Sequence, residues 1–375
     1  MNFEIRLTEA LARLRQGGNL RMLPQVPDSV INLSSNDYLG LLTDEALLDA
    51  FYAQLPRASR RLSAASSRLL TGNVPEAIAF EDALCQAYGS EAALVFDSGY
   101  HANTGILPAL VGKKSLVLAD KLCHASMIDG IRASGCTFYR YRHNDLGHAR
   151  TLLERYASIY DEVFIMTESV FSMDGDRVDI PQLVALKRAF PNVVLYLDEA
   201  HGVGVFGETG LGCAHATGLH QEIDLLVGTL GKAWSSMGAY LICSQVVRNT
   251  LINRMRPFIF TTALPPINLA WSRFVLEALP SLQARRERLL VMGERLAETI
   301  RQQGTVCVSA SQIVPYVIGE NIKAMALAKR FREAGFYVLP IRPPTVPEGT
   351  ARLRFSLTAT VPDVAFERLL ELVQA

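Results

Sequence analysis

The stretch of sequence that decides the fold is Asp224–Ser244, which reads DLLVGTLGKAWSSMGAYLICS. Its two apolar runs, Leu225–Val227 and Ala239–Cys243, predict buried strands that are joined by a tight loop containing glycine. Lys232 lies at the edge of that loop. A lysine in this position is able to reach into a cavity at the end of a sheet, so the stretch predicts both a sheet and a candidate reactive amine.

A second apolar run, upstream of the first stretch, adds an acid and an imidazole. Val193–Leu197 predicts another strand, and Asp198-Glu199-Ala200-His201-Gly202 follows it directly. Alone, a lysine beside glycine is usually a solvated loop charge, and an aspartate after a strand usually caps a helix or forms a turn. The combination is more specific. Pyridoxal 5′-phosphate (PLP) needs a lysine that forms an imine and an aspartate that pairs with its pyridinium nitrogen.

Composition limits the class of protein. The 375 residues suit one large domain with one or two smaller ones, and the contents of hydrophobic (49%) and charged (20%) residues are those of a globular chain. Lys and Arg together number 37, as do Asp and Glu, so no net charge attracts nucleic acid or an anionic membrane. An anionic ligand must therefore be held by a local site.

The cysteines and the N-terminal residues indicate a cellular location. The six cysteines are scattered and include no Cys-x-x-Cys pair, which argues against a metal site or a disulfide framework and favours reduced thiols. Residues 1–18 predict an amphipathic helix rather than a signal peptide, and no run approaches the roughly 18 apolar residues of a membrane span. We expect a soluble, cytoplasmic protein without a metal.

Apolar runs and amphipathic segments alternate between residues 75 and 197. This alternation predicts an α/β domain with a mostly parallel sheet, in which ligands bind at the carboxyl ends of the strands. Those ends are expected to carry Ser98–Tyr100, Asp120, Glu168-Ser169, Asp198 and Thr229. Residues 57–73 predict a loop, and an α+β unit follows Pro265-Pro266. The predicted division is an N-terminal helix and linker at 1–43, a large domain at 44–263 and a small C-terminal domain at 264–375.

Three short motifs each have an ordinary explanation beside a functional one. Asp97–His101, between a strand and a helix, offers free N–H groups to a phosphate or is an ordinary turn. Arg352-Leu353-Arg354 places two guanidinium groups on one face of a strand, either for a substrate carboxylate or as the solvated charge of an edge strand. Gly202–Gly207 matches the dinucleotide fingerprint of nicotinamide-dependent dehydrogenases, but it leads into Gly210 and Gly212 rather than a helix, so we discount it.

Beyond these separate motifs, the chain resembles the α-oxoamine synthases, a family of the PLP fold type I (aspartate aminotransferase-like) superfamily. The resemblance covers nearly the whole chain. It is carried by the segments Ser34–Gly40, Ser98–Asn103, His124–Ser126, Glu168–Asp176, Asp198–Gly204 and Thr229–Lys232. It implies a PLP-dependent acyltransferase with a large α/β domain, whose sheet is mostly parallel, and a smaller α+β C-terminal domain.

The resemblance also assigns cofactor roles to individual residues. It implies that Lys232 carries PLP as an imine and moves the proton at the amino acid Cα, while Asp198 pairs with the pyridinium nitrogen. By the same resemblance, His201 hydrogen-bonds the ring oxygen and His124 stacks over the ring.

The remaining cofactor contacts that the resemblance implies concern the phosphate and the neighbourhood of the ring. Backbone N–H groups of Gly99 and Tyr100 hold the phosphate together with Thr229, and Ser172 lies near the ring. Thr262 reaches the phosphate from a second copy of the chain. The resemblance therefore implies a homodimer with shared active sites.

Substrate contacts are implied in the same way. Asn36 and Arg354 hold the carboxylate of the amino acid, Arg21 helps to place the acyl donor, and Thr345 belongs to the substrate site. Many relatives have a glycine-rich segment where this chain has Ser63–Ser67, so side chains replace backbone freedom in the acyl-binding loop.

Within the family, Ile341–Arg354 is most similar to members that condense L-alanine with a pimeloyl thioester during biotin biosynthesis. Those members release CO2 and a free thiol, and the acyl group is carried by CoA or by acyl carrier protein. One alternative is a sister synthase such as glycine C-acetyltransferase or another acyl-CoA:amino acid C-acyltransferase. An alternative from another class is a catalytically idle PLP-fold binding subunit.

Overall fold

The structure is a computed structural model that describes residues 2–375. The chain separates into two compact units. The larger unit contains Asp37–Ser172 and Arg177–Glu287, and the smaller unit contains the residues through Asn36, Met173–Asp176 and Arg288–Ala375. Each unit has its own sheet and its own helices.

A seven-stranded sheet forms the centre of the larger unit, with the strand order β2-β8-β7-β6-β5-β3-β4. Only β8 runs antiparallel to its neighbours, β2 and β7, and the other pairs are parallel. Residues of β2, β3, β7 and β8 are buried at every position, as continuous apolar runs predict for strands covered on both faces. The strands are β2 (Ala92–Phe96), β3 (Ser115–Asp120), β4 (Thr137–Tyr141), β5 (Glu162–Glu168), β6 (Val193–Asp198), β7 (Leu225–Thr229) and β8 (Ala239–Cys243).

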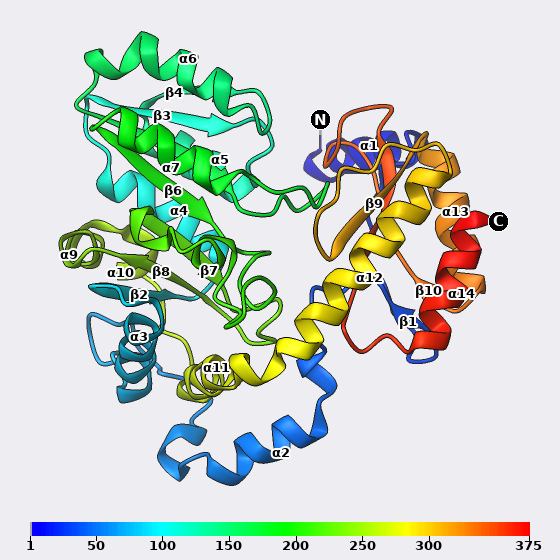
Figure 1. Cartoon of the computed structure of the whole chain (residues 1–375), viewed down its shortest axis with the longest axis horizontal. Helices are drawn as coiled ribbons and strands as arrows, with labels where there is room; N and C mark the ends of the chain where they lie inside the picture. The colour runs from blue at the N-terminus through cyan, green and yellow to red at the C-terminus, as the bar shows by residue number, and fades with distance from the viewer. Residues whose placement is uncertain (1) are drawn as a thin grey trace. The chain divides into compact units, whose positions relative to one another are not determined.

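Helices surround this sheet, with α3 beside β2 at one edge and α6 beside β4 at the other (Figure 1). Side chains of α4 and α5, among them Ile106 and Met127, share one core cluster with Val117 and Phe164 of the sheet. The helices are α2 (Glu45–Gln54), α3 (Pro75–Tyr88), α4 (Gly99–Leu110), α5 (Ala125–Ser134), α6 (Leu146–Tyr156), α7 (Ile180–Ala189), α8 (Cys213–Ala216), α9 (Gln245–Arg254), α10 (Arg256–Ile259) and α11 (Pro266–Ala278). Short 3₁₀ turns complete the unit: η1 (Leu41–Thr43), η2 (Arg57–Arg60), η3 (Ala157–Ile159), η4 (His220–Glu222) and η5 (Leu279–Leu282).

The smaller unit has a three-stranded antiparallel sheet with the order β11-β12-β9, and a separate parallel pair, β1 with β10. Its strands are β1 (Ile31–Asn32), β9 (Ile313–Gly319), β10 (Phe336–Tyr337), β11 (Pro340–Ile341) and β12 (Ala351–Ser356). Its helices are α1 (Phe3–Gln16), α13 (Asn321–Glu333), α14 (Asp363–Gln374) and the later part of α12 (Gln283–Gln302). Within residues 2–375, no helix has the length and hydrophobicity needed to cross a membrane.

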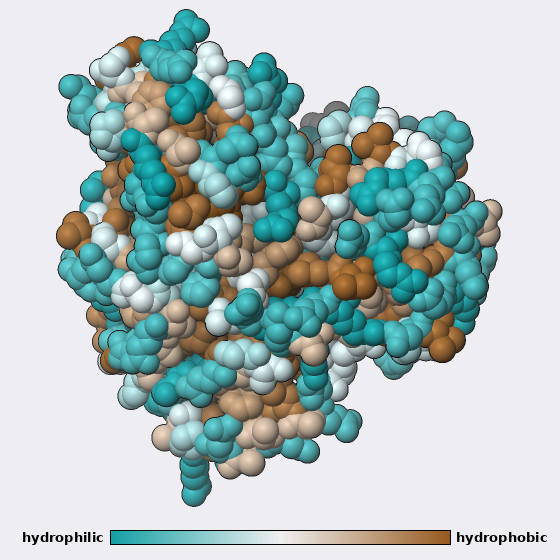
Figure 2. Space-filling view, viewed as in Figure 1, coloured by the Kyte–Doolittle hydropathy of each residue, from teal (hydrophilic) through white to brown (hydrophobic). Residues whose placement is uncertain are grey.

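The prediction of an α/β unit with a mostly parallel sheet is confirmed. The two units differ from the consecutive ranges 1–43, 44–263 and 264–375, because residues through Asn36 group with the C-terminal residues and α12 runs from one unit into the other. In the space-filling view, polar residues cover most of the visible surface, with smaller hydrophobic areas between them (Figure 2).

One alternative from the sequence is wrong. Arg352 and Arg354 are not the solvated charges of an edge strand, because β12 is the central strand of its sheet. Their exposed fractions are 5% and 9%. Arg352 forms an ion pair with Asp174, so at least one of the two guanidinium groups has a structural partner.

Candidate active site

The larger unit has a cavity at the carboxyl ends of its parallel strands, where such sheets bind ligands. The strands β5, β6 and β7 end there in Glu168, Asp198 and Thr229. The cavity has a volume of about 340 Å³. The predicted site residues that line it are Gly99, Tyr100, His124, Asp198, His201, Thr229 and Lys232.

The buried carboxylate of Asp198 is held by two donors. Asn103 Nδ2 donates to Oδ2 at 2.7 Å, and the Ala200 N–H donates to Oδ1 at 2.8 Å. The Tyr196 hydroxyl donates to Asn103 Oδ1 at 2.7 Å, which fixes the end of the amide that faces Asp198. The carboxylate is therefore fixed in one orientation at the floor of the cavity.

Lys232 and His201 are in direct contact. Lys232 Nζ lies 3.2 Å from His201 Nε2, and His201 Nδ1 lies 2.6 Å from the hydroxyl of Tyr38. An ammonium group can only donate, so while Lys232 is charged the Nε2 atom accepts and Nδ1 carries the ring proton. The hydroxyl of Tyr38, which is fully buried, then accepts the hydrogen bond from Nδ1–H and fixes the ring of His201.

The N-terminus of α4 faces the cavity. The Ser98 hydroxyl caps the helix by accepting the His101 N–H at 3.1 Å, and the N–H groups of Gly99 and Tyr100, in the first turn, have no carbonyl partner within the helix. A Cβ atom on Gly99 would lie 2.7 Å from Thr229 Cγ2, so glycine is needed for this close approach. The N–H groups and the positive end of the helix dipole favour an anion here.

His124 and Glu168 form another part of the wall. Glu168 Oε1 accepts the His124 N–H at 2.7 Å, and Glu168 is the register partner of Asp198 on the neighbouring strand. Burial, and then the nearby charge of Asp198, raise the pKa of Glu168 well above its ordinary value of 4.5. Burial lowers the pKa of His124 from 6.5, against the opposing effect of Asp198. His124 is therefore a neutral imidazole at neutral pH.

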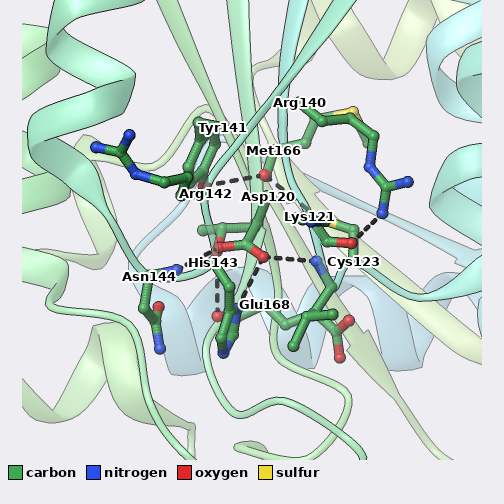
Figure 3. A network of polar contacts seen from close by, with 12 residues as sticks. Asp120, Lys121, Cys123, Arg140, Tyr141, Arg142, His143, Asn144, Met166 and Glu168 are labelled. Atoms are coloured by element: carbon green, nitrogen blue, oxygen red, sulfur yellow. Dashed lines mark hydrogen bonds and ion pairs between the residues drawn. The ribbon is translucent and has the colours of Figure 1, made fainter. Parts of the chain in front are cut away.

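A further buried acid, Asp120, shapes the turn that leads to His124. Asp120 ends β3 and has no exposed surface. Its Oδ1 accepts the Leu122 N–H at 2.7 Å and lies 2.9 Å from His143 Nδ1, and its Oδ2 accepts the Asn144 N–H at 2.8 Å (Figure 3). Because these bonds join the loops after β3 and β4, they hold His124 at the cavity.

Other predicted site residues lie elsewhere. Among the described residues, Ser172 and Thr262 are not part of the cavity lining, and Thr262 is exposed. The four predicted substrate residues form two pairs within the smaller unit. Arg354 Nη1 donates to Asn36 Oδ1 at 3.4 Å, and Arg21 Nη2 donates to Thr345 Oγ1 at 2.7 Å.

Several residues of the cavity and its support were assigned no role from the sequence. Asn103 lies one helical turn after Gly99, so helix periodicity would have placed it on the same face of α4. Tyr38 gives no comparable signal, because 163 residues separate it from His201. Within residues 2–375, no group of three or more His, Cys, Asp or Glu side chains has the arrangement of a metal site.

The groups around this cavity fit PLP. The N-terminus of α4 suits a phosphate, the buried carboxylate of Asp198 suits a pyridinium nitrogen, and the amine of Lys232 suits an aldehyde. The fold and the cavity together define a PLP-dependent enzyme of fold type I.

Comparison with known proteins leads to the same class. Residues 28–373 match the class I and II aminotransferases. Over 379 residues, the chain is 50% identical to the 8-amino-7-oxononanoate synthase of Haemophilus ducreyi, with 96% of this chain and 98% of that protein covered. The chain belongs to the class I and II aminotransferase family, within which it groups with the 8-amino-7-oxononanoate synthases.

Solved structures agree with this assignment. Serine palmitoyltransferase from S. paucimobilis with a bound PLP–myriocin aldimine matches with a TM-score of 0.89 and 27% identity, covering 100% of this chain and 98% of that one. The 8-amino-7-oxononanoate synthase of Francisella tularensis matches with a TM-score of 0.77 and 28% identity, covering 93% and 98%. The predictions of fold type I, of PLP as the cofactor and of an enzyme are confirmed.

Proposed function

We propose that the chain condenses L-alanine with a pimeloyl thioester, with loss of CO2 and release of the thiol, to give 8-amino-7-oxononanoate for biotin biosynthesis. The observation that carries this proposal is the cavity that gathers Lys232, Asp198 and His201. Its support is the 50% identity over nearly the full chain to a protein named for this product. The segment Ile341–Arg354 favours alanine and a pimeloyl donor over the substrates of the sister synthases.

The reaction needs a bond to break at the Cα atom of the amino acid, and PLP, when bound, withdraws the electrons of that bond. We assign to Lys232 the attachment of the cofactor and the transfer of the Cα proton. His201, fixed by Tyr38 on its far side, orients the amine of Lys232 and hydrogen-bonds the ring oxygen. Asp198 pairs with the ring nitrogen and keeps its positive charge in place.

The other cavity residues bind and orient. The N–H groups of Gly99 and Tyr100 hold the phosphate at the start of α4, together with the hydroxyl of Thr229. His124 stacks on the ring, and because burial lowers its pKa it adds no positive charge there. Ser172 is assigned a place near the ring on the family resemblance alone, since it is not part of the cavity lining.

Substrate recognition is assigned to residues of the smaller unit. Asn36 and Arg354 hold the carboxylate of the amino acid, since a guanidinium group matches a carboxylate with two parallel hydrogen bonds. Arg21 and Thr345, which are already hydrogen-bonded to each other, place the acyl donor. The donor is carried either by CoA or by acyl carrier protein.

We also propose a homodimer in which each Thr262 hydroxyl completes the phosphate site of the other chain. The exposure of Thr262 supports this role, since a residue that acts in a second chain must be accessible in the first. The six cysteines are all free thiols, which supports a cytoplasmic location.

The test is the release of thiol by the purified holoenzyme. L-Alanine is combined with pimeloyl-CoA or with pimeloyl acyl carrier protein, thiol is measured with a colorimetric reagent, and the product is identified by mass spectrometry. We expect turnover with at least one of these donors and none with Lys232→Ala. Faster turnover with glycine and acetyl-CoA, or with serine and palmitoyl-CoA, would move the chain to a sister synthase.

A spectroscopic measurement separates the role of Lys232 from the identity of the acyl donor. The near-ultraviolet and visible absorbance of bound PLP is recorded with and without L-alanine, for the wild type and for Lys232→Ala. We expect alanine to shift the band of the wild type, and the ligand-free spectrum to change in the variant. An identical ligand-free spectrum in the variant would show that another group holds the cofactor.

A further inference from the structure

We propose that Glu199 is a positioning residue whose buried carboxylate fixes the loop 202–212 and thereby holds His201 and Lys232 in contact. The proposal rests on the proposed function only in taking Lys232 as the amine that receives PLP. Glu199 is not among the described residues that line the cavity. It lies directly after Asp198 and two residues before His201, so its anchoring affects both neighbours.

The carboxylate of Glu199 has no exposed surface and accepts three hydrogen bonds. The Ser169 hydroxyl donates to Oε2 at 2.6 Å, the Cys213 N–H donates to Oε2 at 3.1 Å, and the Ala214 N–H donates to Oε1 at 2.7 Å. A buried carboxylate is costly unless it keeps such donors. Glu199 therefore joins the end of β5 to the residues that follow the loop 202–212.

Glycines allow the loop to close over this carboxylate. A Cβ atom on Gly202 would lie 2.0 Å from Glu199 Oε2, and a Cβ atom on Gly212 would lie 3.0 Å from the same oxygen. Gly212 also has a φ of +101°, which an L side chain rarely adopts. Gly202, in the stretch that matches a dinucleotide fingerprint, and Gly212, just after it, thus leave space for the carboxylate of Glu199.

The same loop packs against the residues that follow Lys232. Gly204 has a φ of +83°, and a Cβ atom there would lie 2.5 Å from Ala233 Cβ and 3.2 Å from Trp234 Cδ1. The Gly204 N–H donates to the Gly210 carbonyl at 2.7 Å, which closes the loop on itself. The loop 202–212, fixed by Glu199, therefore begins directly after His201 and packs against the two residues that follow Lys232.

The test is Glu199→Gln in the intact enzyme. Glutamine has the size of glutamate, but its NH₂ group replaces one of the carboxylate oxygens. That group cannot accept a hydrogen bond from the hydroxyl or N–H donor that it faces. In the apoenzyme we expect faster amide hydrogen exchange over residues 202–214 and in the peptide that contains Lys232. In the holoenzyme we expect weaker PLP binding, a shifted pH dependence of the PLP absorbance band, and a kcat lower by about 10- to 100-fold with little change in KM.

Asp224→Asn is the matched control. Asp224 directly precedes β7, whose far end lies at the cavity. Its carboxylate pairs with Lys187 at 2.7 Å and accepts the Leu195 N–H at 2.8 Å. We expect this variant to lower Tm while leaving the exchange of residues 202–214, the PLP band and kcat unchanged. If Glu199→Gln behaves like Asp224→Asn in all of these measurements, Glu199 is only a stabilising residue and the proposal is overturned.

A milder variant covers the case in which Glu199→Gln does not fold. Ser169→Ala removes one of the three donors and should change amide exchange and the PLP band in the same direction, by less. An unchanged exchange rate and PLP band in Ser169→Ala would then overturn the proposal. Since neither readout needs an acyl donor, a wrong assignment of the substrates leaves this test intact.

Discussion

Asn103 uses one amide group to fix the acid at the floor of the cavity. Asn103→Ala removes the donor to Asp198 and the acceptor for Tyr196, both buried. We expect the free energy of unfolding to fall by about 1–3 kcal/mol and PLP binding to weaken, because Asp198 keeps only the Ala200 N–H. Urea denaturation and a PLP titration measure the two effects. Tyr196→Phe, which removes only the hydroxyl, should give smaller effects of the same sign.

Glu168 makes the stability of the apoenzyme depend on pH. Its folded-state pKa is raised well above 4.5 by burial and by Asp198, so the folded state binds the proton more tightly than the unfolded state does. Its contribution to stability is therefore most favourable at low pH and is lost as the pH rises from about 4.5 through the raised folded pKa. Because glutamine does not titrate, Glu168→Gln removes this loss of stability at higher pH. The Tm of the variant minus that of the wild type should grow more positive from about pH 5 to pH 8, and parallel Tm profiles would contradict the shift.

At the scale of elements, the contact of α4 with β7 depends on the absence of a side chain. Gly99→Ala places a methyl group 2.7 Å from Thr229 Cγ2 and must push the helix N-terminus away from the strand. Overpacking of this kind costs about 1–3 kcal/mol, so we expect PLP affinity to fall by roughly tenfold or more. Thr229→Ser keeps the hydroxyl and removes the clashing methyl group. The double variant should regain affinity over Gly99→Ala, with Thr229→Ser alone as the control.

The sequence predicted best those strands whose buried residues follow one another directly in the chain. The apolar run at 239–243 has the bounds of β8, whose residues are all buried, because this strand is a short run between turn residues. By contrast, β1 and β10 are only two residues long, since they pair only with each other over two positions. No local pattern sets the length of such a distant pair.

The cavity was predictable to the extent that its residues end strands or begin helices. Asp198 and Thr229 end strands and Lys232 lies three residues after the end of β7, and strand topology brings these positions together. Tyr38 and Glu199 were not predictable, because a partner 163 residues away fixes Tyr38 and close glycine contacts define the role of Glu199. The central position of β12 in its sheet was also not predictable from the sequence, because one of its two neighbours, β11, has only two residues.

At the scale of the whole molecule, the proposed role of Thr262 is tested by mixing subunits. Lys232→Ala and Thr262→Ala homodimers are each expected to be impaired, the first severely and the second in PLP affinity. Exchange between them creates a heterodimer in which one site has both Lys232 and Thr262, so PLP binding and activity should recover on mixing. An absence of recovery, despite exchange seen in native mass spectrometry, would place the action of Thr262 within its own chain. A monomer in sedimentation with full activity would exclude the shared site altogether.

The pairing of β1 with β10 has a consequence for the order in which the protein assembles during synthesis. The ribosome releases β1 early, but its partner follows about 300 residues later, roughly 15–60 s at ~5–20 residues per second. The residues of the seven-stranded sheet all emerge within that interval. The edge of β1 must therefore stay without its partner strand until β10 has emerged, so this pairing is one of the last steps of assembly.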